Sequence, residues 1–251
     1  MLLEGRACLV TGAAGERSIG RAAARLFAEH GARVAILDLD ERASVAAASD
    51  LPGYERHAGY SCNVTDLAGC KSVAERAHGA FGRIDVVVNC AGVAEPTEFL
   101  GITRDAYDLM LDVNLRGTFH VCQAVMPFMV SAGAGSIINL ASVAAQRGGG
   151  LFGGAHYCAA KGGVLSLTKA LAREYGPKGI RANAICPSLV ETAIHGDKLS
   201  DERRKQIVAN VPLGRVGQPS DIAGVCLFLA SDLSAYVTGA EIDVNGGSHI
   251  H

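Results

Sequence analysis

The chain has 251 residues, of which 49% are hydrophobic and 19% charged, so it can bury a large core, and its composition excludes a disordered protein. The 23 Lys and Arg residues nearly balance the 25 Asp and Glu residues, and no long block of like charge occurs, which argues against nucleic acid or an anionic membrane as a partner. A small neutral or anionic ligand fits this charge pattern better.

Short apolar runs alternate with segments of helical periodicity along the whole chain. Seven of the runs are predicted strands, at residues 6–10, 33–38, 60–64, 84–91, 136–142, 181–187 and 241–246. Helices are predicted between them, at residues 19–31, 41–49, 66–82, 104–130, 157–176 and 219–231. This alternation indicates a single α/β domain over residues 1–251, doubly wound, with a seven-stranded parallel sheet covered by helices on both faces.

The alternation breaks over residues 188–218, between the sixth strand and the last helix. The segment is a polar insertion with a short helical pattern, and we expect it to form a substrate lid. His195 in this segment and Glu95, which follows the NCAG motif, are candidates for binding substrate hydroxyls. A solvated side chain is the more common role for residues of this kind.

A glycine-rich turn, TGAAGERSIG, joins the first predicted strand to the first helix. Free backbone N–H groups and the positive end of the helix dipole can hold a pyrophosphate at such a turn. About 20 residues further on, Asp38 ends the second strand, where a carboxylate binds an adenosine ribose diol and repels a 2′-phosphate. We therefore expect NAD rather than NADP. Arg17 in the turn leaves this open, since it is either a solvated loop residue or a phosphate contact.

Tyr157 and Lys161 stand four residues apart in YCAAK, so their side chains share one face of a helix. A lysine one turn from a tyrosine can lower the phenol pKa from about 10, which makes the pair a candidate general base for an alcohol. Such pairs are also common on helix surfaces. Ser142, at the carboxyl end of the fifth strand, and Asn114, inside a long helix that disfavours Asn, strengthen the functional interpretation.

Together with NCAG at residues 89–92, these motifs resemble the short-chain dehydrogenase/reductase family over the whole chain. The resemblance extends from TGAAGERSIG through VNLRG, YCAAK and ICPSLVET to YVTGAEIDVNGG. It implies a Rossmann fold, hydride transfer between a nicotinamide cofactor and a secondary alcohol or its ketone, and assembly into a homo-oligomer, either a tetramer or a dimer.

The resemblance also implies a role for each candidate. Tyr157 corresponds to the acid/base, Ser142 holds and polarises the substrate oxygen, Lys161 binds the nicotinamide ribose and lowers the tyrosine pKa, and Asn114 holds a water of the proton relay. Asn63 and Val64 border the adenine, whereas Val190 and Thr192 grip the nicotinamide carboxamide. The implied cofactor contacts are Gly12, Arg17, Ser18, Ile19, Asp38, Asn63, Val64, Asn89, Tyr157, Lys161, Val190 and Thr192.

Three positions depart from the family pattern. The glycine-rich turn is longer by about two residues than the usual turn and has Ser18 in place of its middle glycine. That spacing resembles the enoyl-reductase branch, but that branch spaces its Tyr and Lys more widely, so YCAAK favours carbonyl and alcohol chemistry. Asn63 stands where Asp is usual, and Ser188 replaces the glycine of the usual Pro-Gly pair.

Arg147 lies in the loop between Ser142 and the tyrosine helix. It is either a surface arginine or a bidentate clamp for a substrate carboxylate or phosphate. The run RGGGLFGGAHY and the tail VNGG-x-x-IH resemble a subgroup that oxidises 2-keto-3-deoxy sugar acids, of the L-fuconate or L-rhamnonate type. His156 beside Tyr157 is predicted to be a packing or loop residue rather than a second base, because adjacent helical residues point about 100° apart.

Two other functions are compatible with these motifs. One is reduction of 3-oxoacyl thioesters on acyl carrier protein with NADPH, against which Asp38 argues. The other is a non-catalytic dinucleotide-sensing protein, against which the intact set of Asn114, Ser142, Tyr157 and Lys161 argues.

The eight cysteines are scattered without a Cys-x-x-Cys pair, and we expect reduced packing residues rather than disulfides or a metal site. The beginning MLLEGRACLVTG lacks a basic segment followed by a long apolar one. No stretch reaches about 18 consecutive apolar residues. The expectation is a cytoplasmic protein that holds no metal and binds no membrane.

Overall fold

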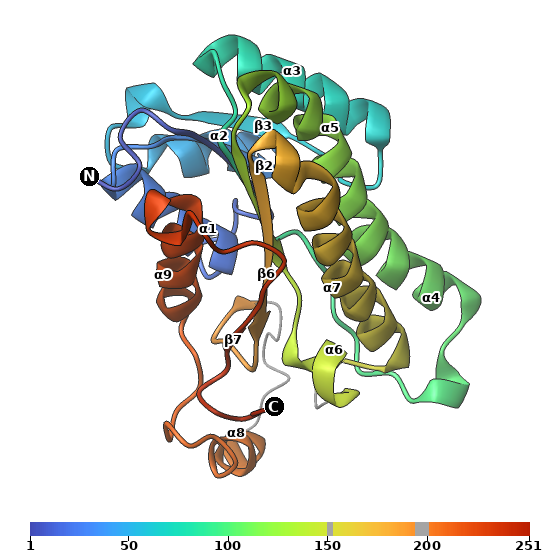
Figure 1. Ribbon diagram of the computed structural model, residues 1–251. Coiled ribbons are helices and arrows are strands. Elements are labelled where there is room, and N and C mark those ends of the chain that lie inside the picture. The colour runs from blue at the N-terminus through green and yellow to red at the C-terminus, as the bar shows by residue number, and fades with distance from the viewer. Residues whose placement is uncertain (150–152, 194–200) are drawn as a thin grey trace.

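The computed structural model describes residues 1–149, 153–193 and 201–251. Its strands form one parallel sheet in the order β3-β2-β1-β4-β5-β6-β7 (Figure 1). The strands are β1 (Ala7–Thr11), β2 (Arg33–Asp38), β3 (Ala58–Ser61), β4 (Val86–Asn89), β5 (Gly135–Leu140), β6 (Ile180–Pro187) and β7 (Glu241–Val244). The predicted seven-stranded parallel sheet is therefore confirmed.

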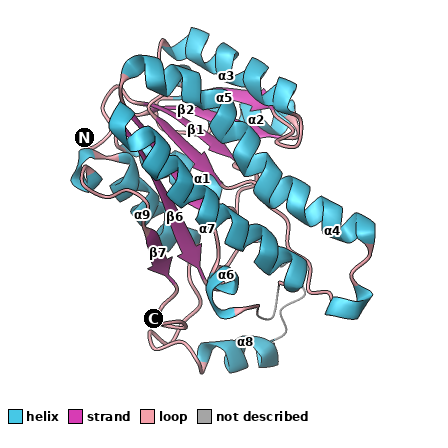
Figure 2. Cartoon of the chain, turned by 45° about the vertical axis from the view of Figure 1, so that its right-hand side comes forward, coloured by secondary structure: helices cyan, strands magenta, loops and turns pink. Residues whose placement is uncertain are grey.

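Helices cover both faces of this sheet. They are α1 (Ile19–Glu29), α2 (Glu41–Ser49), α3 (Leu67–Phe81), α4 (Arg104–Leu111), α5 (Gly117–Ala132), α6 (Val143–Arg147), α7 (Ala155–Tyr175), α8 (Asp201–Val208) and α9 (Pro219–Ala230). One face carries α1, α2 and α9, and the other carries α3, α5 and α7 (Figures 1 and 2). This arrangement is the doubly wound fold that the sequence predicts.

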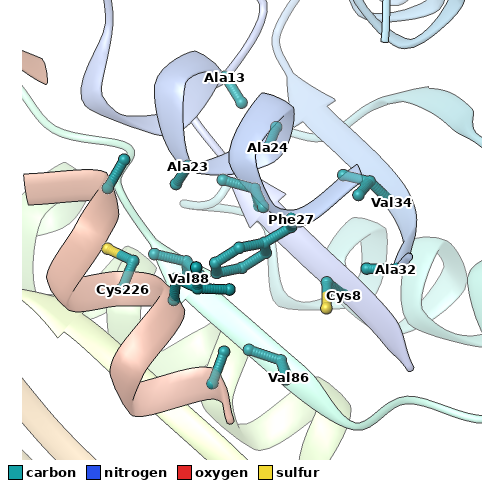
Figure 3. Packing of buried hydrophobic residues seen from close by; sticks show 14 of the residues in the cluster. Cys8, Ala13, Ala23, Ala24, Phe27, Ala32, Val34, Val86, Val88 and Cys226 are labelled. Carbon is teal, nitrogen blue, oxygen red and sulfur yellow. The ribbon is translucent and has the colours of Figure 1, made fainter. Parts of the chain in front are cut away.

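The core follows from the two-residue period of the strands. In β1, Cys8 and Val10 point into the layer beneath α1 and α9, whereas Ala7 and Leu9 point into the layer beneath α3 and α5. The ring of Phe27 on α1 is fully buried and lies toward Val88 of β4 (Figure 3). Because both faces are covered, the central strands are largely apolar, and their few polar side chains, such as Asn89 and Asn139, are buried and hydrogen-bonded.

Three local features differ from the sequence-based expectation. The predicted helix over 104–130 is interrupted by a π-helical turn, Asp112–Arg116, which separates α4 from α5. A short helix, α6, occupies part of the predicted loop after Ser142, because the Ser142 side chain caps it. Strand β3 begins and ends earlier than predicted, so Asn63 and Val64 follow the strand instead of ending it.

The position of the candidate site follows from the strand order. The chain winds outward in one direction from β1 and in the other from β4, so the loops after these two neighbouring strands separate and leave a crevice at their carboxyl ends. The Thr11 hydroxyl accepts hydrogen bonds from Cys90 N and Ala91 N, both at 3.1 Å. Gly12 has φ +64°, and a Cβ there would lie 2.8 Å from the Ala91 backbone, so the close approach requires glycine.

All eight cysteines are unpaired, and six of them are buried. Over the described residues, the structure has no helix that is long and apolar enough to cross a membrane. Within the same part of the chain, no group of His, Cys, Asp and Glu side chains is arranged to hold a metal ion.

Two glycines test the packing of the outer helices. A Cβ on Gly59 in β3 would overlap the backbone of Ser44 and Val45 in α2, whereas a Cβ on Gly79 in α3 would meet nothing within 4 Å. Gly59→Ala should therefore lower the free energy of unfolding by about 1–3 kcal/mol. Gly79→Ala, the matched control, should raise it by about 0.5–1 kcal/mol, because alanine favours the helix. Urea denaturation measures both, and equal effects would contradict the packing described.

Candidate active site

A cavity of about 640 Å³ opens at the carboxyl ends of the strands. It lies between the end of β5, the start of α7 and the segment that contains α8. Figure 2 shows the arrowheads of β6 and β7 pointing toward α6 and α8. The residues predicted from sequence that line this cavity are Ile19, Asn114, Ser142, Arg147, Tyr157, Lys161, Val190 and Thr192.

Ser142 and Tyr157 meet at the cavity wall. Ser142 ends the segment after β5, and its Oγ accepts a hydrogen bond from Ala144 N at 3.1 Å, which fixes the side chain at the start of α6. Tyr157 lies in the first turn of α7. Burial raises the pKa of the Tyr157 phenol above its ordinary value, and a hydrogen bond with the Ser142 side chain opposes this shift. A neutral phenol is therefore held beside a serine hydroxyl.

Lys161 lies one turn further along α7 and is buried, with 6% of its surface exposed. Its Nζ donates a hydrogen bond of 2.6 Å to the Leu140 carbonyl at the end of β5, and lies 5.9 Å from the centre of the Tyr157 ring. Burial lowers the pKa of Lys161 to about 8. The expected lowering of the Tyr157 pKa is wrong for the protein as described, because burial outweighs the other influences on the phenol.

Asn114 is fully buried in the π-helical turn. Its Nδ2 donates to the carbonyls of Met110 and Val93, both at 2.9 Å, and its Oδ1 accepts from Val93 N at 3.3 Å. The bond to Met110, four residues earlier, supports the widened turn that brings Asn114 to the cavity. A Cβ on Gly92 would lie 2.7 Å from Asn114 Oδ1, so this segment also depends on close backbone approach.

The glycine-rich turn fits the pyrophosphate of a dinucleotide. Ser18 caps α1, accepting from Arg21 N at 3.0 Å, and leaves the first turn of that helix facing the crevice. A Cβ on Gly20 would lie 2.7 Å from Gly12 O, so the turn closes too tightly for a larger residue. The Asp38 carboxylate accepts from Ala14 N at 3.0 Å and from Leu39 N at 2.9 Å. An acceptor for a ribose diol is therefore fixed at the edge of this turn.

The residues predicted to border adenine lie after β3, next to Asp38. Cys62 N donates to the Asp38 carbonyl at 2.7 Å, which places the following Asn63 and Val64 beside the end of β2. Asn89 is buried inside the sheet, where its Nδ2 donates to Asn139 Oδ1 at 2.9 Å. Asn89 therefore connects β4 to β5 and is not part of the cavity lining in the described chain.

The chain leaves the sheet after β6 and comes back beside its point of departure, where Gly217 lies next to Val190. Val190 forms a parallel bridge with Gly217; Glu191 N donates to Gly217 O at 2.8 Å, and Gly217 N donates to Leu189 O at 3.0 Å. Ala193 N donates to the Arg17 carbonyl at 3.1 Å, so the lengthened glycine-rich turn contacts this segment. The Arg17 side chain is exposed and does not line the cavity.

The other predicted substrate contacts have different placements. Arg147 lines the cavity, is exposed, and donates weakly to the carbonyls of Gly149 at 3.3 Å and Ser248 at 3.5 Å. Glu95 is exposed and outside the lining. His156 is buried, and neither ring nitrogen has a hydrogen-bond partner among the described residues. His195 lies outside the described residues.

Sequence reasoning assigned no contact to four polar residues that line the cavity, the first of which, Ser188, follows β6. Gln206 and Asn210 come from α8 and the turn after it, and Ser248 comes from the tail after β7. The four-residue spacing of Gln206 and Asn210 inside the predicted lid is a signal that was available. Ser248 has no such signal, because its position depends on how the tail folds back beneath the Arg147 side chain.

Comparison with known proteins places the chain in a family. A protein-family model described as enoyl-(acyl carrier protein) reductase matches residues 12–249 of the chain. An uncharacterized short-chain type dehydrogenase/reductase of Sinorhizobium fredii is 51% identical over 253 residues, and the match covers 100% of both chains. The chain belongs to the short-chain dehydrogenase/reductase family, and is an NAD(P)-dependent oxidoreductase that acts on CH–OH groups.

Relatives with named activities are of more than one kind. The 3-oxoacyl-(acyl-carrier-protein) reductase of Thermotoga maritima is 41% identical, covering 98% of this chain and 99% of its own. The D-threitol dehydrogenase of Mycolicibacterium smegmatis is 40% identical, covering 98% and 93%. A crystal structure of a glucose/ribitol dehydrogenase from Brucella melitensis superposes with a TM-score of 0.91 at 35% identity, covering 100% and 99%.

The buried Lys161 predicts a pH dependence of stability. Its pKa is about 8 in the folded protein and near 10.5 ordinarily, so between these values the unfolded chain binds more protons than the folded one. The free energy of unfolding should therefore rise from pH 8 to pH 10, by on the order of 2 kcal/mol relative to Lys161→Met. Urea denaturation of both proteins at the two pH values measures this. A difference that stays constant would contradict the described environment of Lys161.

Proposed function

We propose that the protein catalyses NAD-dependent oxidation of a secondary alcohol on a small polyhydroxylated acid, a sugar acid such as a 2-keto-3-deoxy acid, or the reverse reduction. The observation that carries the proposal is the convergence of Ser142, Tyr157, Lys161 and Asn114 on one cavity beside the glycine-rich turn. Proton-transfer groups and a dinucleotide cradle at one sheet edge are what such a reaction requires.

Each residue has a chemical role in this proposal. A nicotinamide dinucleotide held at the glycine-rich turn supplies the hydride acceptor or donor. Ser142 holds the substrate oxygen and stabilises negative charge on it. Tyr157 exchanges a proton with that oxygen, and its raised pKa favours the protonated form that delivers a proton to a ketone. Lys161 would hold the ribose of the nicotinamide, and Asn114 would hold a water of the proton relay.

Asp38 supports NAD over NADP. Its carboxylate is oriented by two backbone N–H groups, and an anionic 2′-phosphate would be repelled at the position of the ribose diol. Arg17 is the only cation in the turn before α1, TGAAGERS, and its side chain is exposed. Its carbonyl is committed to Ala193 N, which supports a structural role for this residue in addition to any contact with phosphate.

Arg147 supports an acidic substrate. The Arg147 side chain lines the cavity, and its two hydrogen bonds to described residues, both to backbone carbonyls, are long, so among these residues its donors are not strongly engaged and could bind a carboxylate. The amides of Gln206 and Asn210 and the hydroxyl of Ser248 offer further partners for substrate hydroxyls. The similarity to a D-threitol dehydrogenase and a glucose/ribitol dehydrogenase supports a polyhydroxylated substrate.

Reduction of a 3-oxoacyl thioester with NADPH is the second candidate. The similarity to the 3-oxoacyl-(acyl-carrier-protein) reductase of Thermotoga maritima favours it. Asp38 opposes it, because the carboxylate stands where NADPH carries its extra phosphate.

We also propose that the protein is a homo-oligomer, a tetramer or a dimer. Exposed large apolar side chains on and near α4 and α5 support this, because exposed apolar side chains are often covered in subunit contacts. They are Phe99, Leu100, Tyr107, Leu109 and Phe119.

Tyr157→Phe tests the reaction. Removal of the phenolic oxygen should lower kcat by about 100-fold or more, while NADH binding, measured by fluorescence titration, stays within about twofold. Tyr175→Phe, at the far end of the same helix, is the matched control and should retain full activity. Full turnover in Tyr157→Phe would refute the assignment of this residue.

The substrate class is tested with a panel of acidic and neutral substrates. NAD reduction should be fastest with sugar acids and 2-keto-3-deoxy acids, slower with neutral polyols, and weak with NADP. Arg147→Ala should raise KM for acids by about tenfold, the value of one charge-assisted hydrogen bond, and leave KM for polyols unchanged. Arg104→Ala on exposed α4 is the control. Preference for NADPH with 3-oxoacyl thioesters would establish the second candidate instead.

A further inference from the structure

Helix α8, which contributes to the cavity wall, has few apolar side chains that could pack it against the rest of the protein. Helix α8 reads DERRKQIV, and Ile207 and Val208 are its only apolar residues. In Figure 1 it lies at the lower end of the molecule, below β7. Gln206 and Ile207 nevertheless line the cavity, and Asn210, whose Nδ2 donates to the Gln206 carbonyl at 3.0 Å, lines it too.

An ion pair joins this helix to the segment after β6. Arg204 Nη1 lies 2.5 Å from Glu191 Oε2, and Nη2 lies 2.6 Å from Oε1. Both side chains are 38% exposed. A bidentate pair fixes the angle between the two groups as well as their distance, which a single hydrogen bond does not. The ion pair therefore fixes the orientation of α8, which carries Arg204, relative to the segment after β6.

Glu191 is itself held rigidly. It stands between Val190 and Thr192, which line the cavity, while its own side chain is not part of the lining. Its N–H donates to Gly217 O at 2.8 Å, beside the bridge between Val190 and Gly217. The Glu191 backbone is thus bonded to Gly217, where the chain comes back to the sheet, and the Glu191 carboxylate extends from this point to Arg204 on α8.

We propose that Glu191 and Arg204 are a positioning pair that fixes α8 against the segment after β6, which carries Val190 and Thr192. The pair thereby sets where Gln206 and Asn210 contact the substrate. This inference rests on the proposed function, because it takes the cavity as the substrate site. Neither residue touches the reacting atoms, so the pair acts on substrate binding through α8.

The expected effect is local. A partly exposed ion pair shifts an equilibrium by about two- to fivefold, so its loss leaves the sheet folded and shows in the opening of α8. Glu191→Gln and Arg204→Gln should each speed backbone amide exchange in residues 201–210 by that factor, measured by mass spectrometry on the full chain without substrate. The charge-swapped double variant Glu191→Arg with Arg204→Glu should restore slow exchange. Arg104→Gln, which removes an ion pair to Asp108 on α4, is the control and should leave α8 unchanged.

A kinetic measurement adds a second readout. With the best substrate of the panel, both single variants should raise KM more than they lower kcat, and the double variant should recover the wild-type KM. Unchanged amide exchange in the single variants would overturn the proposal. Faster exchange that the charge swap does not reverse would also overturn it, since the two residues would then not act as a pair.

The test of the ion pair can fail or succeed independently of the test of the proposed function. Absence of NADH binding to the wild-type protein would refute the proposed function, and amide exchange in α8 would still show whether the ion pair holds this helix. Normal NADH binding with unchanged exchange would refute the positioning role alone.

Discussion

The structure depends on the close approach of two backbone segments where the strand order reverses. Gly12, after β1, and Ala91, after β4, are so close that a side chain at residue 12 would overlap the neighbouring main chain. The Thr11 hydroxyl holds the two segments together through two N–H groups. Because the loops diverge from this point, one leads to the dinucleotide cradle and the other to Asn114 and the cavity. A side chain at residue 12 would therefore push apart the glycine-rich turn and the segment that leads to the cavity.

Burial brings the ionisable groups of the site toward neutrality. It raises the pKa of Tyr157 and lowers that of Lys161 to about 8, so burial disfavours the charged form of both side chains. Ser142 opposes the shift of Tyr157 through its side chain, and the Leu140 carbonyl satisfies the Lys161 amine. In this environment, changes in nearby charge have a large effect on the position of a proton.

The sequence predicted the sheet and the main catalytic candidates because these depend on local patterns. Strand periodicity determined β1 to β7 to within a few residues, and Ser142, Tyr157 and Lys161 line one cavity as expected. The features it did not predict depend on contacts between distant segments. Asn114 in the π-helical turn bonds the carbonyl of Val93, a residue distant in the sequence, and the raised pKa of Tyr157 results from burial. Neither contact partner nor burial can be inferred from the spacing of residues in one helix.

The segment from residue 188 to residue 218 begins and ends at neighbouring positions, joined by the bridge between Val190 and Gly217. The entropy of closing such a loop changes only slowly with its length. Substitutions, insertions or deletions in α8 and the turn after it can therefore alter the cavity wall that Gln206 and Asn210 form with little strain on β6 or α9. Ala193, whose N–H bonds the Arg17 carbonyl, is by contrast coupled to the glycine-rich turn. Evolution, or a protein engineer, can therefore vary α8 and its turn as a unit, while Ser142, Tyr157 and Lys161, which lie outside this segment, keep their places in the cavity wall.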